Sequence, residues 1–380
     1  MKDFGIYVHW PFCAAKCPYC DFNSHVRARF DEDVWAKAIV RELEWVKAAQ
    51  GNAVPRVETV FFGGGTPSLM SGRSVATVLD TIALLWPTAD DIEITLEANP
   101  ASADAAHFRD YRAAGVNRVS LGVQALNDAD LKFLGRLHDV AEAKAALKMA
   151  MATFERVSLD LIYARPQQTA KAWREELKEA LTLDTEHLSL YQLTVEPATP
   201  FAVLAREGRL QIPDEDSAAA LFELTQEMTE AAGRPAYEIS NHARAGAECR
   251  HNLIYWRYGD YAGIGPGAHG RLMLGGERIA TVAERLPERW QDNVAREGYG
   301  YVEQTRIGDA EAAREHLLMN LRLAEGLDLA AYEKRWNVAL DAKKIAELQS
   351  HDLVRLDGVT LAATSRGRLV LNSVIAELAT

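Results

Sequence analysis

Cysteine is scarce in this chain: four occur in 380 residues, and three of them lie within a single short segment. Cys13, Cys17 and Cys20 form this group, whereas Cys249 stands alone. A disulfide framework requires cysteine pairs spread through a small secreted chain, so this placement argues against one. We therefore expect the thiols to be reduced and free to bind a metal or to react.

Long hydrophobic runs are also missing. No 18 consecutive apolar residues occur, which excludes a predicted transmembrane helix, and the first residues do not form a charged-then-apolar signal segment. We therefore expect the protein to be located in the cytoplasm. Basic residues are the minority, with 42 Lys and Arg against 54 Asp and Glu and a net charge of −12. This balance argues against nucleic acid or an anionic membrane surface as the main partner.

Apolar β-rich runs alternate with helical patterns through residue 195. Six strands are predicted, at Gly5–His9, Val57–Phe62, Ile92–Glu97, Arg118–Val123, Arg156–Ile162 and Leu188–Val195. Helical patterns between them include 31–49, 68–85 and 169–181. This alternation predicts parallel strands with right-handed crossovers. Six strands rather than eight predict an α/β fold with a partial (β/α)6 barrel, open on one side.

The rest of the chain changes character. A helical pattern over 214–232 precedes a stretch rich in glycine and aromatic residues, which we expect to be irregular. The last residues show three helical patterns and two short β-like pieces, which suit a small domain of winged-helix type. We therefore predict a barrel over 1–235, an irregular extension over 236–304, and a mainly helical C-terminal domain over 305–380.

Polar residues gather where the predicted strands end. The chain shows this at five positions: 63–67, 97–100, Gln124, Asp160 and Gln192. Each of these alone could be a cap or a turn. In a (β/α) barrel, however, the C-terminal strand ends form the functional mouth. Agreement among five strand ends therefore predicts a binding site there.

The cysteine triplet has the spacing C-x3-C-x2-C. Three thiolates this close repel one another unless a cation lies among them. A structural zinc site would need a fourth ligand, for which His9, His25 and Cys249 are the candidates. An iron–sulfur cluster normally takes four cysteines as well, so three would leave one iron with an open coordination position.

With aromatic Tyr19 before its last cysteine, just after the first strand, the triplet resembles the radical S-adenosylmethionine superfamily. The resemblance implies a [4Fe–4S] cluster on Cys13, Cys17 and Cys20, with S-adenosylmethionine on the open iron. The segment Gly63–Pro67 resembles that family's glycine-rich strand, which binds the methionine ammonium group. Without Cβ atoms, backbone can approach a charged ligand closely.

Further segments resemble the oxygen-independent coproporphyrinogen III oxidase family over nearly the whole chain: 7–13, 96–100, 122–124 and 159–163. The resemblance implies that S-adenosylmethionine would be bound by Tyr7, Tyr19, Gly64, Gly65, Thr66, Glu97, Gln124, Arg136 and Asp160. Arg136 would suit a carboxylate through its fork of donors.

The true oxidases of that family carry a further cysteine two residues after the third, where this chain has Phe22. Its segment Cys17–Ser24 instead resembles the sister group, the HemW-type haem chaperones. The sequence His-Asn-Leu-Ile-Tyr-Trp at 251–256 resembles their haem-binding motif. The resemblance implies His251 as the haem-iron ligand, with Asn252, Tyr255 and Trp256 around the macrocycle.

Two further expectations concern the haem site. We expect the haem propionates to meet Arg250, Arg257 and Arg271. Cys249 is a second possible iron ligand, although a buried small side chain is the simpler interpretation.

Three functions are therefore weighed. The first is a haem chaperone that binds a [4Fe–4S] cluster, S-adenosylmethionine and haem and passes haem to an acceptor protein, with another partner supplying haem or electrons. The second is a coproporphyrinogen III oxidase, which would decarboxylate two propionates to vinyl groups. The third is a zinc-stabilised interaction module. We assign no catalytic residue.

Two loop segments need separate comment, because one differs from the family's usual sequence and the other matches an unrelated motif. After Leu161-Ile162-Tyr163 the family usually shows Gly-Leu-Pro-Gly-Gln, whereas this chain has Ala-Arg-Pro-Gln-Gln at 164–168, and we expect the lost glycines to restrict the loop. The segment 265–270 matches the dinucleotide fingerprint G-x-G-x-x-G literally. We reject that interpretation, because Pro266 lies inside it and no helical pattern follows.

Overall fold

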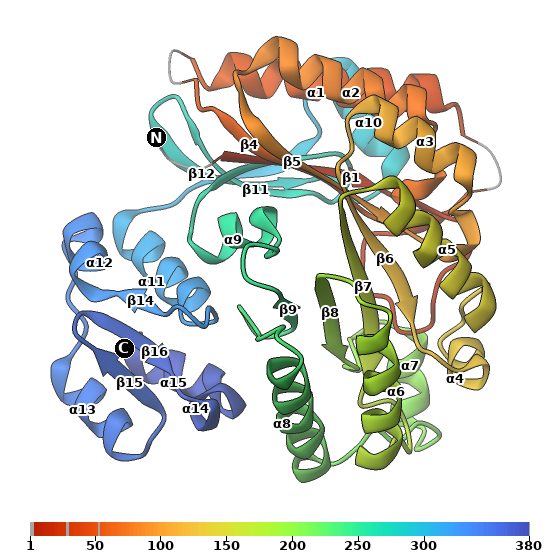
Figure 1. Cartoon of the computed structure of the whole chain (residues 1–380). Helices are drawn as coiled ribbons and strands as arrows, with labels where there is room; N and C mark the ends of the chain where they lie inside the picture. Colours follow the sequence, from red (N-terminus) through yellow and green to blue (C-terminus); the bar gives the residue numbers. More distant parts are fainter. Residues whose placement is uncertain (1–3, 28–29, 52–53, 380) are drawn as a thin grey trace.

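The computed structural model describes residues 4–27, 30–51 and 54–379 (Figure 1). Parts of the predicted barrel (1–3, 28–29 and 52–53) and residue 380 of the predicted C-terminal domain lie outside the described residues. Within the described ranges, no helix is both long and apolar enough to cross a membrane.

All six predicted strands are present and lie side by side in one parallel sheet. They are β1 (Phe4–Trp10), β4 (Val57–Gly64), β5 (Thr88–Ala98), β6 (Arg118–Gln124), β7 (Arg156–Tyr163) and β8 (His187–Gln192). In register, His9 lies opposite Gly63, and Gly122 lies opposite Asp160. The partial (β/α)6 barrel is therefore confirmed. Because its six strands are parallel, their C-terminal ends lie at the same edge of the sheet.

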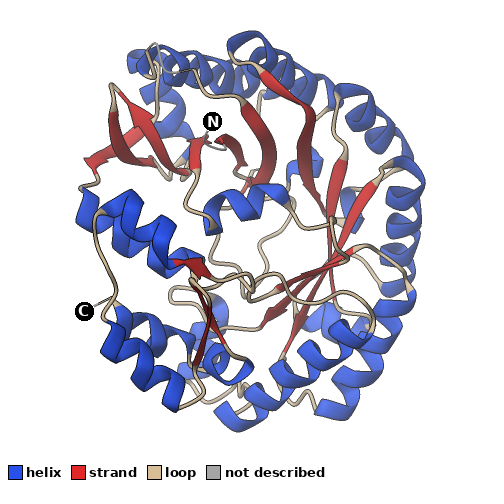
Figure 2. Cartoon of the chain, turned by 60° about the vertical axis from the view of Figure 1, so that its left-hand side comes forward, coloured by secondary structure: helices blue, strands red, loops and turns tan. Residues whose placement is uncertain are grey.

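Helices cover the outer face of this sheet, as the ring of helices in Figure 2 shows. The helices of this part of the chain are α1 (Glu32–Ala49), α2 (Gly72–Leu85), α3 (Ala105–Ala114), α4 (Asp128–Phe133), α5 (Val140–Thr153), α6 (Ala170–Thr182), α7 (Pro200–Arg206) and α8 (Glu215–Ala231), with short turns η1 (Pro67–Leu69) and η2 (Pro100–Ser102). Of these, α7 contacts the cysteine loop, where the Phe201 N–H donates to the Pro18 carbonyl. In α1, Asp31 caps the first turn, and Trp35, Ile39, Leu43 and Val46 bury one stripe of the helix. This three-to-four-residue spacing is what a helix packed on a sheet requires.

The prediction that 236–304 is irregular is wrong. The segment forms β9 (Asn241–Ala243), α9 (Arg250–Trp256), β10 (Asp260–Ile264), β11 (His269–Leu274), β12 (Glu277–Ala283), α10 (Pro287–Glu297) and β13 (Tyr301–Arg306). β10 extends the sheet in parallel beside β1, β11 to β13 continue it antiparallel, and β9 pairs antiparallel with β8. Gly275 and Gly276 form the turn between β11 and β12, whereas Gly263 lies within β10 and Gly270 within β11, so glycine does not prevent strand formation here.

The C-terminal residues form a separate core. They fold into α11 (Asp309–Asn320), β14 (Leu327–Asp328), α12 (Leu329–Trp336), α13 (Ala342–Ser350), β15 (Val354–Asp357), β16 (Thr360–Ala363), α14 (Ser365–Leu369) and α15 (Leu371–Leu378). The three strands make a small antiparallel sheet, and Leu317, Leu361 and Val374 are buried at the centre of this domain. The expected small, mainly helical domain is therefore present.

The loop at 164–168 keeps the backbone shape that glycines would favour. Ala164 and Gln167 both have left-handed φ values, 55° and 62°. Arg165 lies between them, almost fully buried, and forms ion pairs with Glu176 and Asp130. Ala164 and Gln167 therefore occupy left-handed positions that strain the backbone of a residue with a Cβ atom.

The glycine-rich segment 265–270 is a strand connection, as expected. It leads from β10 into β11 and not into a helix. Gly267 has a φ of 77°, and a Cβ atom there would lie 2.5 Å from Asn23 Nδ2. Asn23 in turn donates hydrogen bonds to the carbonyls of Pro266 and Arg285. The segment therefore supports the loop that carries the cysteines.

Candidate functional site

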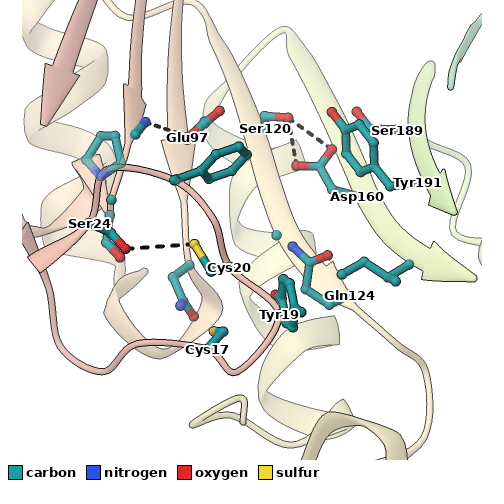
Figure 3. A pocket seen from close by; sticks show the side chains of 18 of the residues that line it. Cys17, Tyr19, Cys20, Ser24, Glu97, Ser120, Gln124, Asp160, Ser189 and Tyr191 are labelled. Carbon is teal, nitrogen blue, oxygen red and sulfur yellow. Dashed lines mark hydrogen bonds between the residues drawn. The ribbon is translucent and has the colours of Figure 1, made fainter. Parts of the chain in front are cut away.

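One cavity of about 640 Å³ opens at the C-terminal ends of the parallel strands and reaches into the barrel (Figure 3). All three clustered cysteines line it, as do all nine residues expected to bind S-adenosylmethionine. Three of the four expected haem residues, His251, Asn252 and Tyr255, line it too. The structure therefore brings two predicted sites together in a single space.

The cysteine loop lies between two short strands, β2 (Phe12–Cys13) and β3 (His25–Val26), which pair in parallel. Figure 3 shows Cys17 and Cys20 on this loop, with the Cys20 sulfur directed at the Ser24 hydroxyl 3.8 Å away. Thr66 Oγ1 donates to Cys13 Sγ at 3.3 Å, and Arg136 Nη1 lies 3.6 Å from Cys17 Sγ. A cation and a hydroxyl directed at sulfur suit thiolate ligands.

The three sulfur atoms are neighbours but do not form a preformed cage. Among the described residues no group of three metal-binding side chains is gathered closely enough to hold an ion. Burial raises the pKa of the Cys13 thiol; Thr66 opposes this, and the charges of Cys20 and Cys17 raise it further. A bound cation would remove that repulsion, so the donor set fits a metal centre with three thiolate ligands.

None of the three candidates for a fourth zinc ligand lines the cavity. His9 uses one ring nitrogen with the Tyr7 hydroxyl and the other with the Asn23 carbonyl. His25 contacts the Asn23 side chain, and Cys249 is fully buried deep in the barrel. A set of three sulfur ligands with an open fourth position is therefore what the chain offers.

The glycine-rich strand passes very close to its neighbour. Gly64 has a φ of 112°, and a Cβ atom there would lie 2.6 Å from the His9 ring. Any larger residue would displace that ring and the Tyr7 hydroxyl hydrogen-bonded to it. Glycine is therefore required at this edge of the cavity, as the resemblance implied.

Two carboxyl groups face the cavity from adjacent parts of the sheet. Burial, and then the charge of Asp160, raise the pKa of Glu97 to about 8, while the Gly64 N–H bonded to Glu97 opposes the rise. Burial also raises the pKa of Asp160, against hydroxyl donors that include Ser120 and Ser158. Two buried carboxyl groups with raised pKa values suit a cationic ligand, which favours their ionised form, or ribose hydroxyls.

Gln124 and Arg136 meet at the mouth. Gln124 ends β6 with a left-handed φ of 75°, which is unusual for a residue other than glycine and marks a strained position at the cavity. Arg136 Nη2 donates to the Gly122 carbonyl at 2.8 Å, beside Gln124. Tyr19 lies on the cysteine loop near Gln124, as Figure 3 shows.

His251 lies at the inner part of the cavity and is only 1% exposed. Its Nε2 atom is 2.6 Å from the Tyr255 hydroxyl, and its Nδ1 atom is 2.6 Å from Thr59 Oγ1. Burial, reinforced by the charge of Arg118, lowers the pKa of His251 to about 3. The imidazole is therefore neutral near pH 7, as an iron ligand must be, but both of its nitrogens already have partners.

Trp256 does not line the cavity, so its expected place in the haem site is not supported. His251 and Tyr255 are four residues apart on helix α9 and share a face, whereas Trp256 is one residue further and points elsewhere.

The three arginines expected at haem propionates are placed elsewhere, which corrects that expectation. Arg250 pairs with Glu58 and Asp91, Arg257 with Glu325, and Arg271 with Glu315. None of the three lines the cavity. Cys249 is fully buried 3.5 Å from Glu93 Oε1, and burial raises its thiol pKa to about 12. It is therefore a protonated core thiol.

Sequence reasoning missed several residues that line the cavity: Lys16, Phe61, Arg118, Ser120, His187, Ser189 and Tyr191. Most come from alternate positions of the parallel strands. Residues 118, 120, 122 and 124 of β6 all face inward, as the twofold period of a strand dictates. Extending that period back from Gln124 would have found Arg118 and Ser120.

Comparison with known proteins agrees with this geometry. The Radical SAM superfamily matches residues 7–180, and the HemN C-terminal domain matches residues 309–370. The solved structure of coproporphyrinogen III oxidase (HemN) from Escherichia coli, described as a radical SAM enzyme, superposes with a TM-score of 0.83. It covers 100% of this chain and 90% of that one at 22% identity. Fold and site therefore define a radical SAM protein.

Two curated relatives cover nearly the whole chain. The heme chaperone HemW of Escherichia coli (strain K12) is 43% identical over 385 residues, covering 99% of this chain and 98% of that protein. The mouse protein named radical S-adenosyl methionine domain-containing protein 1, mitochondrial, is 39% identical over 98% of this chain and 87% of its own length. The chain belongs to the HemW family of radical SAM proteins.

Proposed function

We propose that this protein is a haem chaperone: it binds a [4Fe–4S] cluster, S-adenosylmethionine and haem, and delivers haem to an acceptor protein. One observation carries the proposal: the cavity is lined by the cysteine triplet, by the nine residues expected to bind S-adenosylmethionine, and by His251, Asn252 and Tyr255. Membership of the HemW family supports it.

The residues around the cysteines are suited to hold the first two groups. When bound, the cluster would supply an iron with an open position for the amino and carboxylate groups of S-adenosylmethionine. Arg136 is placed to neutralise negative charge near Cys17, and the carboxyl of Glu97 faces the cavity next to the Gly64 backbone. These residues orient a ligand that carries both charges.

Phe22 favours the chaperone over the oxidase. It stands where the oxidases of the family carry a further cysteine, and its side chain is 61% exposed at the cavity rim. A phenyl ring cannot ligate iron, but an exposed apolar ring at the mouth is suited to contact a flat macrocycle.

The haem step is tested by anaerobic cluster reconstitution followed by haem titration. We expect a Soret band in the wild type that weakens in His251→Ala. Trp256→Phe is the matched control, because Trp256 belongs to the same motif but lies outside the cavity. Unchanged haem affinity in His251→Ala would count against His251 as ligand, and no haem binding by the wild type would overturn the proposal.

The two rivals have their own tests. Conversion of coproporphyrinogen III under anaerobic conditions with reductant and S-adenosylmethionine would establish the oxidase instead. Metal analysis that found one zinc per chain, without iron or sulfide, would select the zinc-stabilised module. We expect neither result, because the chain offers three thiols to the cavity, while none of the candidates for a fourth zinc ligand (His9, His25 and Cys249) lines it.

Partners and location complete the proposal. A haem chaperone requires an apo-protein that accepts haem and a partner that supplies haem or electrons. We propose that this protein interacts with both kinds of partner. Nucleic acid is not among the proposed partners, given the net charge of −12. A cytoplasmic site of action stays a prediction, since curated relatives include bacterial proteins and proteins named mitochondrial.

A further inference from the structure

Arg118 is a buried cation that lines the cavity without a protein partner. It begins β6, six residues before Gln124, so its Cα lies roughly 20 Å below the mouth. Its side chain is 2% exposed and faces the barrel interior. It forms no hydrogen bond or ion pair with any residue that the structure describes, and its Nε atom is buried without a partner.

The carboxylates nearest to Arg118 are already engaged by other donors. Glu93 accepts from Arg156 at 2.8 Å and from the His251 backbone N–H at 3.1 Å. Asp160 accepts from the hydroxyls of Ser120 and Ser158. These acids offset the charge of Arg118 at a distance but leave its donors unused. A buried guanidinium whose donors make no hydrogen bond to the protein is costly unless a ligand or ordered water satisfies them.

The other arginines do not offer this chemistry to the inner cavity. Arg136 lies at the opposite end, bonded to the Gly122 carbonyl and close to Cys17. Arg250, Arg257 and Arg271 pair with acidic side chains outside the cavity. Arg118 therefore supplies the guanidinium of the inner cavity, the part that His251 also lines.

We propose that Arg118 forms a carboxylate-binding subsite at the inner end of the cavity, and that the carboxylate it holds is a propionate of haem. The proposal rests on the haem-binding function proposed above. A guanidinium fork matches a carboxylate in shape and charge, and pairing would satisfy donors that the protein leaves free. The carboxylate of S-adenosylmethionine is the other possible source, and the experiment separates the two.

The test compares haem with haem dimethyl ester, whose propionates carry no charge. We expect the ester to bind the wild type about 10- to 100-fold more weakly than haem, the effect of one charge-assisted hydrogen-bonded pair. In Arg118→Gln the preference for the free acid should shrink to near unity. Arg250→Gln is the matched control and should keep the wild-type preference, because Arg250 already pairs with Glu58 and Asp91.

Three results would overturn the proposal. One is equal binding of haem and its ester by the wild type, which needs no variant and so holds even if Arg118→Gln fails to fold. Another is an equal loss of haem and ester binding in a folded Arg118→Gln protein. The third is a loss in Arg118→Gln of S-adenosylmethionine binding but not of decarboxylated S-adenosylmethionine binding, which would assign the subsite to that ligand.

The fold of each variant is checked by thermal melting and cluster reconstitution, with Arg118→Lys as a variant that keeps the charge. Arg118→Lys should retain part of the preference for the free acid. Failure of the underlying function looks different: the wild type would then bind neither haem nor its ester.

Discussion

The Tyr255 hydroxyl lies 2.6 Å from Nε2 of His251, while Thr59 Oγ1 lies 2.6 Å from Nδ1 on the other side of the ring. The imidazole therefore joins helix α9 to strand β4 and also forms part of the cavity wall. Iron could bind His251 only after one of these hydrogen bonds is given up. Of the two partners, Tyr255 is the one that lines the cavity.

This relationship predicts that Tyr255→Phe binds haem more tightly than the wild type. Removing the hydroxyl frees Nε2, and a typical net hydrogen bond of about 1 kcal/mol corresponds to roughly fivefold in affinity. Soret titration measures the change. Tyr261→Phe is the control, since Tyr261 contacts the Tyr255 ring edge-on but does not line the cavity. Equal or weaker haem binding in Tyr255→Phe would contradict His251 as the ligand.

Binding of S-adenosylmethionine should depend on pH through Glu97. Its pKa is about 8, raised by burial and the charge of Asp160, so the free carboxyl is largely protonated at pH 7. A cationic ligand favours the ionised form, so affinity should rise between pH 7 and 8 and level off above the pKa. Calorimetry on cluster-loaded protein in two buffers of different ionisation enthalpy should also detect proton release. Glu97→Gln should bind weakly with no such rise, and a pH-independent wild type would refute the assignment.

Haem and S-adenosylmethionine should compete. His251 and Tyr255 line the same cavity as Glu97 and Asp160, and the Tyr7 and His251 rings are 6.5 Å apart, so a macrocycle on His251 would extend into the space expected for S-adenosylmethionine. Linkage then requires each ligand to weaken the other by the same factor. Haem titrations at increasing S-adenosylmethionine test this, and residual haem binding in His251→Ala should not respond. A ternary complex with unchanged affinities would show that haem binds elsewhere.

Gln167→Gly should stabilise the protein. Gln167 is exposed with a left-handed φ of 62°, a conformation that glycine adopts without steric cost. After the greater flexibility of glycine in the unfolded chain is subtracted, we expect a gain of about 0.5–1 kcal/mol in the free energy of unfolding. Denaturant titration measures it. Gln349→Gly, in helix α13, is the matched control and should lower the free energy of unfolding by about 1 kcal/mol. If both substitutions lowered the free energy of unfolding, the backbone at Gln167 would not be strained.

Much of the barrel and its mouth could be predicted because the signals are local. A strand such as β1 is a short, mostly apolar run buried on both faces, and it can be recognised without knowing its neighbours. The cysteine triplet is also local, since its spacing alone places three sulfur atoms on one loop. Strand-end residues such as Glu97 and Asp160 follow from a rule of topology, because parallel strands end at one edge.

The errors concern long-range pairing. The segment expected to be irregular contains β10, which is five residues long and is a strand because β1 offers it a parallel edge. Arg250 and Arg271 were expected to meet propionates, but their side chains pair with acids that lie far away in the sequence. Nothing near an arginine in the chain reveals which distant carboxylate will neutralise it.

By itself, then, the sequence determined the chemistry available to this protein: three sulfur ligands, a glycine-rich edge, inward-facing carboxyls and a histidine motif. The tertiary structure alone decided that these groups share one cavity, that Trp256 is outside it, and that Arg118 faces it without a partner. The physical reason is that spacing along a strand or helix sets only the direction of a side chain. Whether that direction leads to a ligand, to an opposite charge or to solvent depends on which other segments fold against it.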